Sequence, residues 1–259
     1  MAKIKNFKTI FPAVSVPLND DYTINEPEFR AYLRWIKSFY DKGIQGLVCN
    51  GHTGEITGLS RAERRRVVEI CSEECGDIMT IISGINCENT IESIEMAKEA
   101  KEAGADGILL MPPHMWLRFG MHKDAPYEYV KDVAEGADID IIIHLYPATS
   151  KAFYPVGTLI KMCKEIEHVK CIKMGTRVTS IYEHDVRLLR QECPDISLIT
   201  CHDETLCVSW FPGMDGALIG FAGCVPEIIC PAREVFANPD KHTLKEAQDW
   251  SDRIYHISQ

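Results

Sequence analysis

The stretch Val169–Gly175, with the sequence VKCIKMG, has the composition of a buried β-strand, because it is short, apolar and contains β-branched residues. Near its C-terminal end stands Lys173, although lysine is rarely buried without a partner. Removal of water disfavours the ammonium form and lowers the pKa, which leaves a nucleophilic amine that can form a Schiff base with a carbonyl substrate. The alternative interpretation is a surface lysine at the end of a strand.

Strand-like and helix-like segments alternate on both sides of this stretch. Their apolar strands lack polar alternation, which indicates a parallel sheet buried on both faces. The other expected strands are Phe7–Leu18, Gly43–Gly51, Ile78–Ile85, Gly107–Met111, Ile139–Tyr146, Ile196–His202 and Gly216–Phe221. The expected helices are Glu26–Lys42, Arg61–Cys75, Asn89–Gly104, Pro126–Glu135, Pro155–Ile166, Val178–Cys193, Asp203–Phe211, Pro226–Ala237 and Thr243–His256, with a loop over His114–Ala125.

Repeated β/α units of this kind, within about 250 residues, have the length of one (β/α)8 barrel. A doubly wound open sheet would instead carry a glycine-rich phosphate loop after its first strand, and Pro17–Asp20 is not one. We therefore predict an α/β fold, a single (β/α)8 TIM barrel with a short C-terminal helical extension. The barrel is expected over residues 1–238 and the last helix over residues 239–259.

Composition and charge exclude several classes of partner. The chain has 259 residues and a formal net charge of -10, which argues against nucleic acid or an anionic membrane as a partner. No apolar run approaches the roughly 20 residues needed to span a bilayer, and the N-terminus lacks a signal peptide pattern, so we expect a cytoplasmic protein. The 11 cysteines are scattered, and no His or Cys cluster completes a zinc site around Cys71 and Cys75.

Because the active site of such a barrel lies at the C-terminal ends of the strands, polar residues there are the candidates for function. The loop Gly51–Glu55 can present backbone N–H groups and the Thr53 hydroxyl to a carboxylate, since its glycines permit close approach. The same loop is equally an ordinary turn whose glycines supply positive φ angles.

Two side chains at the end of the fifth strand are candidates for proton transfer. The hydroxyl of Tyr146 can both donate and accept a proton, and His144 lies on the same face by strand alternation. One of them is expected to be the acid/base group and the other a packing residue. Arg118 and Lys151 are candidate charge partners for an anionic substrate, each with the alternative of a solvated side chain.

A metal site is the competing interpretation of the strand ends. The run His202–Glu204 could meet His52, His114 and His144 there, but carboxylate ligands are few. We therefore expect no metal, and expect Asp203 to cap the short helix that follows it.

Nearly the whole chain resembles the dihydrodipicolinate synthase / N-acetylneuraminate lyase superfamily of class I aldolases and lyases. The order and spacing of the matching motifs are specific for the superfamily, although each motif alone is weak. They are Phe11-Pro12-Ala13, Pro17-Leu18, Gly43-x-x-Gly46-Leu47, Gly51-x-Thr53-Gly54-Glu55, Leu59-Ser60, Glu63-Arg64, Gly104-Ala105-Asp106-Gly107, Pro112-Pro113, Ile172-Lys173 and Gly213-x-Asp215-Gly216.

The resemblance implies that Lys173 forms a Schiff base with pyruvate or a related 2-oxo acid. It implies that the Thr53 loop holds the substrate carboxylate and that a tyrosine of the fifth strand moves protons. Alignment on tyrosine selects Tyr146 for that role, whereas alignment on Pro147 places His144 there. The catalytic set is therefore Lys173, Tyr146 and His144, and the substrate-binding set is Thr53, His52, Gly54 and Gly220.

Several residues depart from the family pattern. His52 replaces the small hydroxyl residue usual before Thr53, and His114 and Met115 stand where the synthases carry a relay tyrosine. Residues Thr149–Lys151 stand where the synthases place an arginine. These departures argue against dihydrodipicolinate synthase activity itself, and the C-terminal region is shorter than is usual in the family.

The expected activity is that of a lyase or aldolase that uses a lysine imine to act on a 2-oxo acid, with an aldehyde as its second substrate in the aldol direction. No cofactor is expected, because the iminium supplies the electrophile. An imine-based dehydratase or hydratase-aldolase is the first alternative, and a non-catalytic 2-oxo acid-binding barrel is the second. The resemblance also implies a homo-oligomer, a dimer or tetramer.

Overall fold

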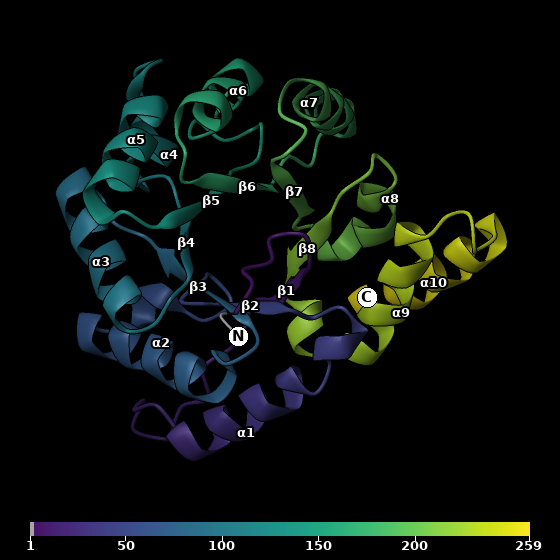
Figure 1. Cartoon of the computed structure of the whole chain (residues 1–259), viewed down its shortest axis with the longest axis horizontal. Helices are drawn as coiled ribbons and strands as arrows, with labels where there is room; N and C mark the ends of the chain where they lie inside the picture. Colours follow the sequence, from purple (N-terminus) through teal and green to yellow (C-terminus); the bar gives the residue numbers. More distant parts are fainter. Residues whose placement is uncertain (1–2) are drawn as a thin grey trace.

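The computed structural model describes residues 3–259 as an inner ring of parallel strands enclosed by an outer ring of helices (Figure 1). Neighbouring strands pair in the order β1-β8-β7-β6-β5-β4-β3-β2. The strands are β1 (Ile10–Pro12), β2 (Gly46–Cys49), β3 (Thr80–Ile85), β4 (Gly107–Leu110), β5 (Asp140–Leu145), β6 (Val169–Met174), β7 (Ser197–Thr200) and β8 (Gly216–Ile219).

Helices follow the strands in the chain and cover the outside of the ring. The helices are α1 (Glu26–Lys37), α2 (Arg61–Cys75), α3 (Thr90–Glu102), α4 (Met115–Phe119), α5 (Ala125–Ala137), α6 (Val156–Glu165), α7 (Thr179–Glu192), α8 (Leu206–Trp210), α9 (Pro226–Ala237) and α10 (Leu244–Ser258). Short 3-10 turns are η1 (Tyr40–Lys42), η2 (Ile56–Gly58), η3 (Asp203–Thr205) and η4 (Phe221–Gly223). The predicted boundary at residue 238 falls between α9 and α10, and α10 packs against α8 and α9.

Strand β1 closes the ring. Its residues Ile10–Pro12 pair in parallel register with residues 217–219 of β8. On its other side, Ala13 forms an isolated parallel bridge with Val48 of β2, and the Val14 N–H donates to the Val48 carbonyl at 3.0 Å. The (β/α)8 barrel is therefore confirmed.

Two separate apolar cores follow from the alternation of side chains along the strands. The larger core lies between the outer face of the strands and the helices. The smaller core fills the barrel with at least one side chain from every strand: Phe11, Ala13, Val48, Ile82, Leu109, Met111, Ile142, Cys171, Ile199 and Leu218. A residue two positions beyond one of these, at the C-terminal end of its strand, consequently faces the mouth of the barrel.

The predicted loop over His114–Ala125 is wrong in part, because it contains α4. The carboxylate of Glu88 accepts the backbone N–H groups of His114 and Met115 at 3.2 and 3.0 Å, which supplies the cap that the local sequence lacks. Gly120, with a φ of 74°, ends the helix.

Strand β1 and helix α1 are also shorter than the strand and the helix that the sequence predicts. Strand β1 covers three residues of the expected Phe7–Leu18, and two prolines in that segment have no N–H to donate to a sheet. Helix α1 ends at Lys37, where the Ser38 hydroxyl donates to the Trp35 carbonyl at 2.6 Å. Helix α2 begins with a capping box, in which Ser60 and Glu63 are each bonded to the other's backbone N–H.

Within residues 3–259, no helix has both the length and the apolar character needed to cross a membrane.

Candidate active site

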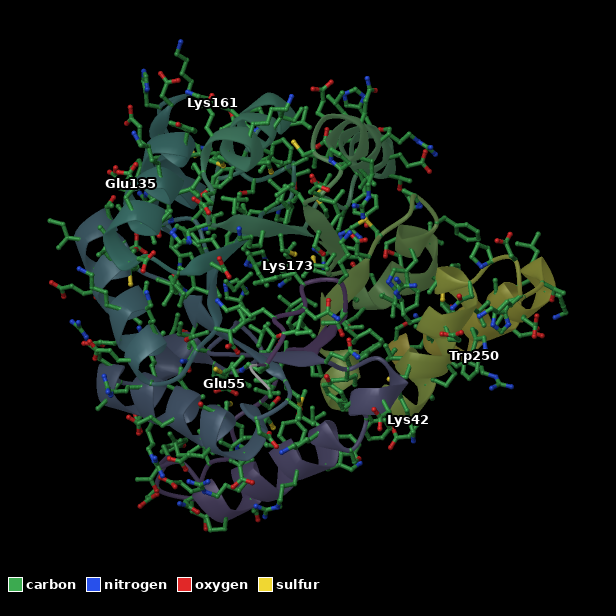
Figure 2. The ribbon with its side chains drawn as sticks, in the orientation of Figure 1. Lys42, Glu55, Glu135, Lys161, Lys173 and Trp250 are labelled. Carbon is green, nitrogen blue, oxygen red and sulfur yellow. The ribbon has the colours of Figure 1, made fainter. Side chains whose placement is uncertain are left out.

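Lys173 lies at the C-terminal end of β6, two residues beyond Cys171 of the barrel core. Its position near the centre of the ring is visible in Figure 2. Burial lowers the pKa of the Lys173 amine, because the ammonium loses its water. Nearby Cys201 and Asp203 oppose this shift, whereas the positive charge of Arg177 adds to it. Lys173 is half-buried, with its side chain at the wall of the barrel mouth.

A cavity of about 280 Å³ opens at this end of the barrel, and Lys173 is part of its wall. Side chains from the ends of several strands meet there, as expected for this fold. The lining residues are Ala13, His52, Thr53, His144, Tyr146, Pro147, Lys173, Arg177, Cys201, Asp203, Leu218, Ile219 and Gly220.

The two candidate proton-transfer residues occupy different positions in this cavity. His144 is the register partner of Lys173 on the neighbouring strand, and its ring lies 4.9 Å from that of Tyr146, centroid to centroid. Among the described residues, no hydrogen-bond partner reaches the buried Nδ1 of His144. The Tyr146 hydroxyl instead lies 3.2 Å from Nε2 of His52 and 3.3 Å from Nε2 of His114.

Burial determines the charge states of His144, His52 and Tyr146. It lowers the pKa of His144 well below its ordinary value, and the charge of Lys173 adds to that effect. It also lowers the pKa of His52 and raises that of Tyr146. The imidazoles of His144 and His52 are consequently neutral at pH 7, and the phenol keeps its proton.

The loop that carries His52 and Thr53 has a constrained backbone. Asn50 and Glu55, on either side of it, both have φ angles of 51°, in the left-handed region that non-glycine residues rarely adopt. A Cβ at Gly54 would lie 2.9 Å from the Val14 carbonyl oxygen, so glycine is required for this close approach. His52 and Thr53 are exposed at the rim of the cavity.

The structure adds one charged residue, Arg177, that sequence reasoning did not assign to the site. Arg177 lines the cavity and pairs with Glu204 at 2.6 Å between Nε and Oε1. Its position three residues after the β6 strand was the available signal. The predicted charge partners Arg118 and Lys151 do not line the cavity; the Lys151 amine donates to the Arg118 backbone carbonyl at 2.9 Å.

The predicted helix cap at Asp203 is wrong. Its carboxylate does not bond to the following turn η3 but accepts the backbone N–H of Gly220 at 3.1 Å and of Phe221 at 2.8 Å. Asp203 thus caps the turn η4 after β8, a partner far away in the chain. Burial raises the pKa of its carboxyl. Gly220, predicted to bind substrate, lines the cavity, and its N–H is bonded to Asp203.

Within residues 3–259, no group of three or more His, Cys, Asp or Glu side chains could hold a metal ion. The histidines that suggested a metal are arranged around a tyrosine: the rings of His52 and His114 lie 6.2 Å apart, with the Tyr146 hydroxyl bonded to both.

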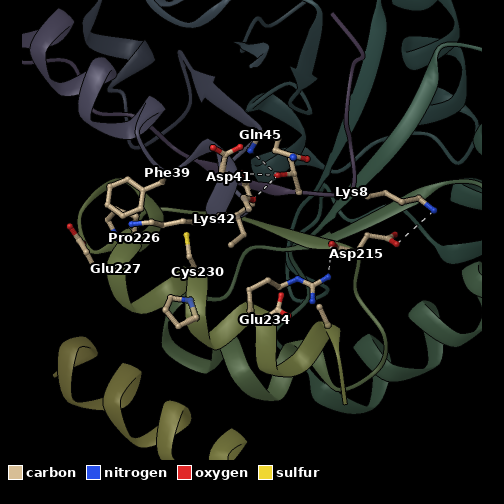
Figure 3. Close-up of a pocket in the computed structure, with 16 residues that line it drawn as sticks. Lys8, Phe39, Asp41, Lys42, Gln45, Asp215, Pro226, Glu227, Cys230 and Glu234 are labelled. Carbon is tan, nitrogen blue, oxygen red and sulfur yellow. Dashed lines mark hydrogen bonds and ion pairs between the residues drawn. The ribbon is translucent and has the colours of Figure 1, made fainter. Parts of the chain in front are cut away.

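A larger cavity, of about 640 Å³, lies at the opposite end of the barrel (Figure 3). It is lined by residues at the N-terminal ends of β1, β2 and β8 and by α9. Its cations are engaged: Lys8 reaches Asp215 at 3.9 Å, and Lys42 lies 4.8 Å from the centre of the Phe39 ring. Because barrel active sites lie at the C-terminal ends of the strands, the Lys173 cavity is the candidate.

Three comparisons with known proteins agree with one another. An uncharacterized DapA-like lyase of Pyrococcus horikoshii is 30% identical over 251 residues, which cover 96% of this chain and 82% of that protein. A 4-hydroxy-tetrahydrodipicolinate synthase of Bartonella bacilliformis is 28% identical over 249 residues, covering 95% and 80%. The fold matches that of YagE, a prophage protein of the dihydrodipicolinic acid synthase family from Escherichia coli solved in complex with pyruvate, with a TM-score of 0.86.

The YagE match covers 97% of this chain and 81% of that one at 20% sequence identity, so it shows the fold alone. The model of the "Dihydrodipicolinate synthetase family" matches residues 6–257, which is almost the whole chain. The chain therefore belongs to the dihydrodipicolinate synthetase family, as a divergent member of this superfamily of lyases and aldolases.

Proposed function

We propose that the protein is a lyase or aldolase that forms a Schiff base between Lys173 and a 2-oxo acid of the pyruvate type. The observation that carries this proposal is the amine of Lys173, which faces the cavity at the mouth of the barrel and has its pKa lowered by burial. A larger fraction of such an amine is unprotonated near neutral pH, and only the unprotonated amine attacks a carbonyl.

The chemistry needs no cofactor. The Lys173 nitrogen adds to the C2 carbonyl carbon, and loss of water from the carbinolamine gives an iminium. The C3–C4 bond then breaks with its electron pair moving into the iminium, so that an aldehyde leaves and an enamine remains. Protonation of the enamine at C3 and hydrolysis release pyruvate and restore the amine; the reverse sequence forms the bond.

The cleavage step requires a base for the C4 hydroxyl, and we assign this role to His144. Its imidazole is neutral and lies on the strand next to Lys173, in register with it. Tyr146 is the alternative, but its hydroxyl is already bonded between His52 and His114. We assign binding of the substrate carboxylate to the Thr53 hydroxyl and the backbone N–H groups at Gly54, with His52 at the same rim.

Borohydride reduction in the presence of pyruvate tests the imine directly. We expect a stable adduct in the intact mass, mapped to Lys173 by peptide analysis and absent in Lys173→Ala. Lys170→Ala is the matched control, because Lys170 lies on the same strand and does not line the cavity. Absence of an adduct with pyruvate and with the bulkier 2-oxobutyrate would contradict the proposal.

A dehydratase or hydratase-aldolase that uses the same imine is the second candidate. The hydrogen-bonded group of Tyr146, His52 and His114 favours it, because a second proton donor can protonate a departing hydroxyl. The products distinguish the two: cleavage releases an aldehyde, whereas dehydration gives a conjugated product with ultraviolet absorbance. An adduct without turnover of any hydroxylated 2-oxo acid would instead favour a non-catalytic binding barrel.

A further inference from the structure

A second cavity, of about 180 Å³, lies beside the Lys173 cavity, between the segment after β6 and the segment after β7. Thr176, Tyr182, His202 and Ser209 contribute to its wall. Arg177 lines both cavities, so the two adjoin at this side chain. The proposed function does not use this second cavity.

Two buried polar atoms in its wall lack a partner. Oγ1 of Thr176 and Nε2 of His202 have no hydrogen-bond partner among the described residues, although Thr176 is 0% exposed and His202 is 4% exposed. A buried polar atom without a partner costs about 1–3 kcal/mol, so such atoms are rare in folded proteins. Their presence together in one cavity indicates a ligand that bonds to both.

The two other buried polar side chains of the wall, Tyr182 and Ser209, are bonded to the protein. The Tyr182 hydroxyl donates to the Ser209 carbonyl at 3.0 Å, and the Ser209 hydroxyl donates to the Leu206 carbonyl at 2.7 Å. The Tyr182 ring lies 5.2 Å from the His202 ring, centroid to centroid, and offers an apolar surface beside that imidazole. Among the buried side chains of the wall, the unpartnered polar atoms are therefore those of Thr176 and His202.

The charges of the wall argue against an anionic ligand. Arg177 is already paired with Glu204, and Glu183 adds a second carboxylate, so the acidic groups outnumber the guanidinium. His202 does not supply the missing positive charge, because burial lowers its pKa and the nearby Arg177 adds to that effect. A ligand that suits these groups is neutral and carries hydroxyls.

We propose that this second cavity binds a short, neutral carbon chain with adjacent hydroxyl groups, which bond to His202 Nε2 and Thr176 Oγ1 while the carbon chain lies against Tyr182. A ligand of this kind belongs to one of two molecules. The first is a substrate whose 2-oxo acid end lies at Lys173 and whose far end enters this cavity; this alternative rests on the proposed function. The second is a separate polyol.

Binding of erythritol, followed by saturation-transfer NMR, tests the cavity without any imine chemistry. We expect saturable binding to the wild type and to Lys173→Ala. We expect at least a tenfold loss of affinity in Thr176→Val, which removes the hydroxyl but keeps the shape, and in His202→Phe. Thr176→Ser is the matched control, because it keeps the hydroxyl and should retain binding.

Measurement of Tm shows whether a variant loses erythritol binding because it misfolds. Thr176→Val replaces an unpartnered hydroxyl by a methyl group, so its Tm should not fall below that of the wild type. Absence of saturable erythritol binding by the wild type overturns the proposal. Equal erythritol affinity in the wild type, Thr176→Val and His202→Phe also overturns it, because the molecule would then bind elsewhere.

Kinetics distinguish the two alternatives. If the ligand is the far end of the substrate, Thr176→Val raises the KM for glyceraldehyde in the aldol direction at least tenfold and leaves pyruvate adduct formation unchanged. If the ligand is a separate polyol, saturating erythritol changes the rate of pyruvate adduct formation in the wild type but not in Thr176→Val. Failure of the pyruvate adduct itself contradicts the proposed function alone, since erythritol binding does not depend on it.

Discussion

His144 and Lys173 are register partners on the adjacent parallel strands β5 and β6, so an imidazole and an amine stand side by side at the mouth of the barrel. The register of the two strands shifts between Ile141 and Ile142, and Ile142–Leu145 then pair in regular order with Cys171–Met174. Parallel register partners project to the same face of a sheet. The position of the His144 imidazole beside the Lys173 amine is thus set by strand pairing rather than by a loop.

This relationship predicts different effects for two substitutions. His144→Gln should lower turnover about 100- to 10,000-fold, the usual contribution of a general base, while the borohydride adduct with pyruvate still forms. Tyr146→Phe should have a smaller effect, because it removes a hydroxyl bonded to His52 and His114 rather than the register partner of Lys173. Comparison of kcat for both variants is the measurement, and a greater loss in Tyr146→Phe would assign the base to Tyr146.

The lowered pKa of Lys173 predicts the pH dependence of imine formation. Only the unprotonated amine reacts, so the rate should rise with pH and level off as the amine loses its proton. Because burial lowers the pKa, the midpoint should lie below 10.5, the ordinary value for lysine. Initial rates of adduct formation between pH 6 and pH 11 give this midpoint, and a midpoint at or above 10.5 would show that the amine is not desolvated.

Three histidines whose pKa values are lowered in the folded protein predict a loss of stability in acid. Burial lowers the pKa of His52, His144 and His202 in the folded protein below the ordinary 6.5. Below pH 6.5 the unfolded chain binds protons that the folded protein does not, so the free energy of unfolding falls as the pH falls through the folded-state pKa values. Urea titrations at pH 7.5 and pH 5.5 should show this decrease.

A variant identifies the source of that decrease. His144→Phe removes the imidazole whose pKa is lowered well below its ordinary value, and it should reduce the difference in unfolding free energy between the two pH values. His122 is exposed and serves as the control, because His122→Phe should leave the difference unchanged. An equal pH dependence in His144→Phe and the wild type would contradict the assignment.

The glycine that follows β6 predicts a large effect on stability. A Cβ at Gly175 would lie 2.0 Å from the Leu145 carbonyl oxygen, a backbone atom of the neighbouring strand. Gly175→Ala should therefore separate β5 from β6, lower the free energy of unfolding by about 3 kcal/mol and displace Lys173 from His144. Denaturant unfolding measures the stability, and the pyruvate adduct yield reports the displacement.

Gly157 provides a matched control for this substitution. It lies in α6, and nothing is within 4 Å of a Cβ placed there, so Gly157→Ala should raise stability by about 0.5–1 kcal/mol through helix propensity. If Gly175→Ala were as stable as Gly157→Ala, the close contact with β5 would not be a constraint on the strand pair.

The barrel was predictable because apolar strands and amphipathic helices alternate in the sequence, and local patterns decide both. Lys173, His144 and Tyr146 were predictable for a related reason, since each stands at the end of such a strand. The helix α4 was not, because its cap is Glu88, about one β/α unit earlier in the chain. Side chains that act across large sequence distances leave no local pattern.

The same reason explains the errors in the site. The partners of Asp203 are the backbone groups of Gly220 and Phe221, which the fold brings to it, and the nearby helix suggested a local cap instead. Arg177 lies in the cavity because the chain turns there after β6, whereas Arg118 and Lys151 contact one another. Residues on strands could be placed by alternation, but residues on connecting segments could not.

The pairing of β1 with β8 has a consequence for the birth of the protein on the ribosome. Ile10 is made long before its neighbour in the sheet, Ala217, because seven further strands of the barrel lie between β1 and the end of β8. In the interval between the synthesis of β1 and that of β8, the first strand therefore has an unpaired edge, of the kind that attracts other chains. Until the eighth strand has been made, the nascent barrel is an open, curved sheet. The mouth in which Lys173 stands is complete only when β8 pairs with β1.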